Sequence, residues 1–75
     1  LALNSQLGGS DEGAAMYLAG EAAAGHIDAM RSSCQAAVDS DPQGALRVAG
    51  QLDALVAQGL AGDEVVPLLE VLRSS

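Results

Sequence analysis

His26 and Cys34 are the only histidine and the only cysteine of the chain, so they are the first candidates for chemistry. A neighbouring imidazole can take the thiol proton and leave a nucleophilic thiolate. However, no third residue in the surrounding sequence would orient the imidazole, and no glycine-rich motif accompanies the pair. Cys34 also falls on an apolar helical stripe, where a free cysteine behaves as a small buried hydrophobe. We therefore expect a buried Cys34, an exposed His26 in a turn, and no catalytic activity.

The segment 39–44, Asp-Ser-Asp-Pro-Gln-Gly, begins like a calcium-binding loop. Such a loop needs a bidentate glutamate at its twelfth position, where this chain has Gly50. Asp41 has a simpler explanation, because it precedes Pro42 and can cap a helix that begins there. The chain contains no lysine, so it also lacks the phosphate-binding lysine of a P-loop. We expect neither a metal nor a cofactor.

The composition limits the class of partner. Ten acidic residues against three basic ones give the 75-residue chain a net charge of −7, which would repel nucleic acid and anionic membrane surfaces. No apolar run reaches the roughly 18–20 residues that span a bilayer. A lone cysteine excludes an internal disulfide framework and favours a reducing compartment. We expect a cytoplasmic protein with a flexible arm, or the end of an upstream segment, at residues 1–10 and one helical domain at residues 11–75.

The first half of the domain predicts helices around a glycine. Residues 11–24 form the first expected helix, with Asp11 and Glu12 in its first turn. Gly25 then offers a break before a second helix over residues 27–39. The expected buried positions of this second helix are Ile27, Met30, Cys34, Ala37 and Val38. A stripe that continues across Gly25 leaves a single long helix over residues 11–39 as the alternative; its members are Met16, Ala19, Ala23, Met30 and Ala37.

The second half predicts two more helices. Asp41 and Pro42 open a helix over residues 42–58, followed by a loop over residues 59–62. Asp63 is expected to cap a final helix over residues 64–73, in which Pro67 is tolerated because it lies in the first turn. The expected core stripe of the first of these helices is Ala45, Val48, Ala49, Leu52, Leu55 and Val56, and that of the second is Val65, Leu68, Leu69 and Leu72.

Gly59 follows Gly25 by 34 residues, and several apolar residues match in the same frame. Stacked helical hairpins produce such spacing. The predicted fold class is therefore all-α, a small bundle of two helical hairpins with four helices. The alternative is a bundle of three helices with a long first helix.

The stretch from Leu18 to Pro42 resembles a tetratricopeptide repeat, a hairpin with small residues at fixed places, a glycine before the turn and an Asp-Pro near its end. The residues in the corresponding frame are Gly25, Asp28, Ala37, Asp41 and Pro42. Departures are the missing large aromatic of the first helix, Met30 in place of an alanine, and Pro67 in the second copy. The resemblance implies a scaffold that binds peptides or proteins.

These observations favour a non-catalytic protein–protein interaction module, such as an adaptor, co-chaperone or assembly subunit. The alternative is a dimerising or docking element from a large multidomain enzyme such as a modular synthase. Either would bind a protein partner or a second copy. We expect that surface on the C-terminal helix, where Val66 and Val71 lie off the buried face beside Glu64 and Glu70, which would attract a partner with a basic rim.

Overall fold

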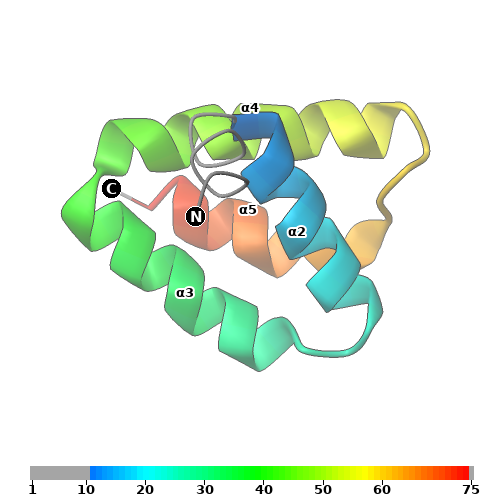
Figure 1. Cartoon of the computed structure of the whole chain (residues 1–75), viewed down its shortest axis with the longest axis horizontal. Coiled ribbons are helices and arrows are strands. Elements are labelled where there is room, and N and C mark those ends of the chain that lie inside the picture. The colour runs from blue at the N-terminus through cyan, green and yellow to red at the C-terminus, as the bar shows by residue number, and fades with distance from the viewer. Residues whose placement is uncertain (1–10, 75) are drawn as a thin grey trace, which may run out of the picture.

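The structure is a computed structural model, and it describes residues 11–74 of the chain (Figure 1). The predicted all-α fold with four α-helices is confirmed for this part of the chain. The predicted arm at residues 1–10 lies outside the described residues. The elements are α2 (Asp11–Ala23), α3 (Ile27–Ser40), α4 (Pro42–Ala57), the 3-10 helix η1 (Asp63–Val65) and α5 (Val66–Leu72).

Gly25 breaks the first half of the chain into two helices. Its φ of 91° is the left-handed conformation that glycine adopts without a steric penalty. The Gly25 amide donates to the Ala22 carbonyl at 3.0 Å and the His26 amide to the Glu21 carbonyl at 2.9 Å, the two hydrogen bonds of a Schellman motif. The hairpin is therefore confirmed, and the single long helix is excluded.

Gly59 ends α4 with the same motif. Its φ is 78°, its amide donates to the Val56 carbonyl at 3.0 Å, and the Leu60 amide donates to the Leu55 carbonyl at 2.9 Å. The 34-residue recurrence thus marks two equivalent helix ends. The corresponding helices of the two halves also pack together, α2 against α4 and α3 against α5. Figure 1 shows α2 and α3 diverging from their turn, with α5 in the opening between them.

One core joins all the helices. Leu52 of α4, Val65 of η1 and Leu68 of α5 are completely inaccessible to solvent. The predicted stripe of α4 is confirmed except at Val48, which is only partly buried, and at Val56, which is exposed. Hydrophobic periodicity predicts which face of a helix is buried, but not how far along that face the neighbouring helices reach. Val56 lies in the last turn of α4, beyond the part of the face that is covered. The buried side chains are Ala15, Leu18, Ala19, Ala22, Met30, Cys34, Val38, Ala45, Ala49, Leu52, Leu55, Val65, Leu68, Leu69 and Leu72.

Three other positions of the predicted stripes are exposed, namely Met16, Ala23 and Ala37. Met16 is 58% exposed, because α2 packs through the face that carries Ala15, Leu18 and Ala19. Ala37 is also exposed, since α3 packs through Met30, Cys34 and Val38, four residues apart. All three errors come from extending a stripe by one helical position too many around its helix.

The C-terminal segment begins differently from the prediction. Val65, Leu68, Leu69 and Leu72 are buried as predicted, but Asp63 does not cap an α-helix. In a helix capped at Asp63, the amide of residue 67 would make the first α-helical hydrogen bond, and Pro67 has no amide proton. The chain therefore forms η1 first, and α5 starts at Val66 with Pro67 in its first turn. Among the described helices, none combines the length and apolarity needed to cross a bilayer.

A candidate binding groove between α2, α3 and α4

A solvent-open groove of about 370 Å³ lies between the N-terminal half of α2, the C-terminal half of α3 and the N-terminal half of α4. Its buried apolar surface comes from Leu18, Cys34, Ala45 and Leu72. Tyr17, the only aromatic residue of the chain, also lines the groove and is 60% exposed. The other lining residues are Asp11, Ala14, Ser33, Ala37, Ser40, Asp41, Gly44, Arg47 and Val48.

The groove exists because the facing side chains are too small to fill it. α2 contributes Ala14 and α3 contributes Ala37 at positions where the two helices have already diverged from the Gly25 turn. A methyl group on each wall leaves space that leucine side chains would occupy. The opening of the hairpin and its alanines together produce a concave apolar surface.

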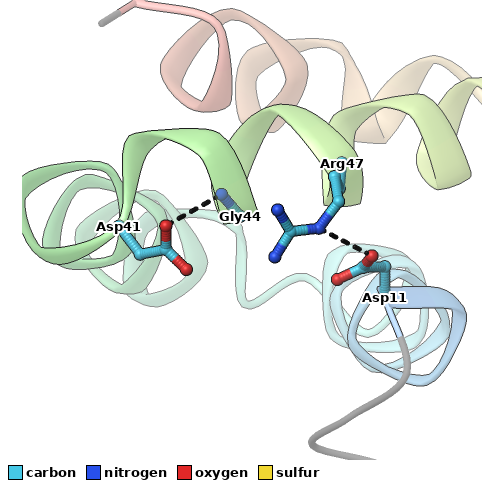
Figure 2. Close-up of polar contacts among 4 residues, drawn as sticks. All are labelled: Asp11, Asp41, Gly44 and Arg47. Atoms are coloured by element: carbon cyan, nitrogen blue, oxygen red, sulfur yellow. Dashed lines mark hydrogen bonds and ion pairs between the residues drawn. The ribbon is translucent and has the colours of Figure 1, made fainter.

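Charged residues from α2 and α4, and from the residue that precedes α4, line the groove (Figure 2). Asp41 caps α4, where its Oδ1 accepts a hydrogen bond from the Gly44 amide at 3.0 Å. Arg47, one turn further along α4, donates from Nε to Oδ2 of Asp11 at 3.1 Å. Gly44 leaves room for the Asp41 carboxylate, which a Cβ at this position would push aside.

His26 and Cys34 do not form a catalytic pair. Cys34 is buried in the groove, and desolvation by burial raises the pKa of its thiol, so the thiol stays protonated. His26 is exposed in the turn, as predicted, and its Nδ1 lies 3.5 Å from the Glu21 carboxylate. Eight positions along a helix separate the two residues by about 12 Å.

The aspartates of the segment before α4 make local hydrogen bonds. The Asp39 carboxylate accepts a hydrogen bond from the Gln35 side chain at 3.2 Å, and Asp41 caps α4. Within residues 11–74, no group of three His, Cys, Asp or Glu side chains is arranged to hold a metal ion. The cap therefore accounts for Asp41, as the sequence predicted.

The four residues predicted to bind a partner do not form one patch. Val66 is 43% exposed, and Glu64 and Glu70 are exposed beside it along the chain. Val71 instead packs partly against the core, in a shallow polar depression on α3 that includes Arg31. Five helical positions place Val66 and Val71 about 140° apart around the helix. Partner binding by these residues stays a prediction.

Sequence reasoning did not find the groove, although it named several of its residues. Asp41 was predicted as a cap, and Ala37 and Cys34 as core positions of one helix. No spacing in the sequence shows that Asp11 and Arg47, which lie 36 positions apart, meet at one rim. Comparison with protein families, with curated proteins and with solved structures finds no match for this chain.

Proposed function

We propose that the protein is a non-catalytic interaction module that holds a segment of a partner protein in the groove between α2, α3 and α4. The observation that carries the proposal is the groove itself, an apolar depression that stays open to solvent beside organised charged residues. Hot spots of protein interfaces are apolar or aromatic anchors that fill such pockets within a polar rim. The resemblance to tetratricopeptide hairpins favours the same class of function.

The size and chemistry of the groove favour anchoring side chains as its occupants. Its volume of about 370 Å³ lies near the lower end of the roughly 300–1,000 Å³ typical of ligand pockets. Cys34 is the most nucleophilic type of side chain in the groove, and burial holds it in the unreactive thiol form. A few aliphatic side chains of a partner would cover Tyr17, Ala37 and Val48 without any chemical step.

Two neighbouring alanines of α3 provide the test. Ala36 and Ala37 are both exposed, but only Ala37 lines the groove. Peptides selected from a random displayed library against the wild-type chain are the probes, and their affinity is then measured for Ala37→Trp and Ala36→Trp. A tryptophan at position 37 fills the groove, so we expect at least a roughly tenfold loss of affinity there, and less than about twofold at position 36.

The same variants separate a different partner from a second copy. If the wild-type chain dimerises through the groove, sedimentation will show a dimer that Ala37→Trp dissociates and Ala36→Trp does not. Enriched peptides that bind both variants equally, or a library that yields no binder, would overturn the proposal.

A further inference from the structure

We propose that the occupant of the groove is an amphipathic helix that carries lysine or arginine beside its apolar face, an inference that rests on the proposed function. Its apolar side chains would cover Tyr17, Ala37 and Val48, and its cation would bind Asp11 and Asp41. The walls are helices, whose backbone groups bond within each helix, so they offer no free strand edge to an extended peptide. A helix laid into a groove needs only side-chain anchors at helical spacing.

The charges around the groove favour a cationic partner. Asp11 and Asp41 are two of its three charged lining residues, and the chain as a whole carries −7. Each carboxylate uses one oxygen in the contacts above, Oδ2 of Asp11 for Arg47 and Oδ1 of Asp41 for Gly44. No residue within 11–74 donates a hydrogen bond to Oδ2 of Asp41. In the proposed complex an incoming ammonium or guanidinium group would bind this oxygen, which lies beside Gly44.

Arg47 stands where the partner's cation would bind. Figure 2 shows its guanidinium between Asp11 on one side and Gly44 with its capping Asp41 on the other. Arg47 is half exposed, so it can be displaced from Asp11 at little cost. It therefore competes with the partner, and its removal would strengthen binding, whereas removal of either carboxylate would weaken it. Opposite effects on affinity from substitutions at Arg47 and at the two aspartates would identify this competition.

Synthetic amphipathic helices test the charge preference directly. The probes share one leucine face and carry lysine, glutamine or glutamate on the flanks. We expect the lysine peptide to bind at least about tenfold more tightly than the glutamate peptide at low salt, and to lose most of this advantage at high salt. Equal binding of the lysine and glutamate peptides would overturn the inference.

Variants of the chain test which residues bind the cation of the lysine peptide. Asp11→Asn and Asp41→Asn are made as separate single variants, so that each tests one carboxylate. Asparagine at position 41 is still a good N-cap residue. Each should weaken the lysine peptide by about 3- to 10-fold, while Arg47→Gln should strengthen it by a similar factor. Asp28→Asn is the matched control, because it removes the same charge from α3 outside the groove and should change affinity by less than about twofold.

The outcomes distinguish this inference from the proposed function. If library peptides bind in the groove and Ala37→Trp blocks them, but they are neutral or acidic, the function stands and the cationic helix is wrong. If the lysine peptide binds Ala37→Trp as tightly as wild type, it lies elsewhere on the acidic surface, and the inference is overturned. A weakening by Arg47→Gln would equally overturn it, because Arg47 would then belong to the binding surface.

Discussion

The groove and the C-terminal segment Gly62–Leu72 both combine apolar residues with acidic ones, but they use them in different ways. In the C-terminal segment the apolar face is buried, and the outward surface keeps only Val66 as an exposed large apolar residue. In the groove, apolar side chains from α2, α3 and α4 converge on a space that no residue within 11–74 fills. An apolar residue left over on one helix is therefore a weaker sign of a binding site than a space between several helices.

The difference follows from how the helices pack. α5 packs against both α3 and α4, so its apolar side chains are covered on both flanks. α2 and α3 are joined by a short turn but diverge from it, and the walls that face each other there carry alanines. Close packing buries the apolar surface of the C-terminal segment, whereas the divergence of α2 and α3 leaves apolar surface exposed in the groove.

The largest expected difference between the two regions is in stability. Leu68→Ala, at a fully buried position of α5, should lower the free energy of unfolding by about 2–5 kcal/mol. Tyr17→Ala, at the exposed wall of the groove, should lower it by less than about 1 kcal/mol. Denaturant unfolding monitored by circular dichroism measures both. Similar losses would show that the groove wall is part of the core and that the comparison fails.

A smaller effect tests whether the charged side of the groove is built as described. Gly50→Ala in α4 meets open space and should raise stability by about 1 kcal/mol, the ordinary helix preference for alanine. Gly44→Ala also replaces glycine by a better helix former, but it displaces the Asp41 carboxylate. Its gain in the free energy of unfolding should therefore be smaller than that of Gly50→Ala by about 0.5–2 kcal/mol. Equal gains in thermal unfolding would mean that the Asp41 cap contributes nothing.

The smallest expected effect is a difference in stability between substitutions of two valines in the C-terminal segment. Val71→Ser removes a methyl pair that packs partly on the core and should cost about 1 kcal/mol. Val66→Ser changes an exposed side chain and should stay within about 0.5 kcal/mol. Both are read from chemical unfolding. If the two variants lower the free energy of unfolding by the same amount, Val71 is as exposed as Val66. The C-terminal surface predicted from the sequence would then be an alternative binding site to the groove.

Local features of the sequence predicted the helices and their ends. Asp41 and Pro42 marked the start of α4, because a cap and a proline act on the backbone within one turn. Gly59 marked the end of α4 for the same reason, since the left-handed backbone of a Schellman motif favours glycine, and Gly25 offered an end for α2 on the same ground. The inner stripes of α4 and α5 were predictable because several large side chains repeat at helical spacing.

The tertiary structure alone decided where those helices meet. The sequence left open whether Gly25 broke a helix, because small residues give apolar stripes that fit either arrangement. It also placed Ala37 and Val56 in the core, since periodicity does not specify which neighbour covers a given turn. The meeting of Asp11 with Arg47 depends on how α2 packs against α4, and the space beside Ala14 and Ala37 depends on the angle between α2 and α3. That angle is set by packing over the whole bundle, and no local pattern encodes it.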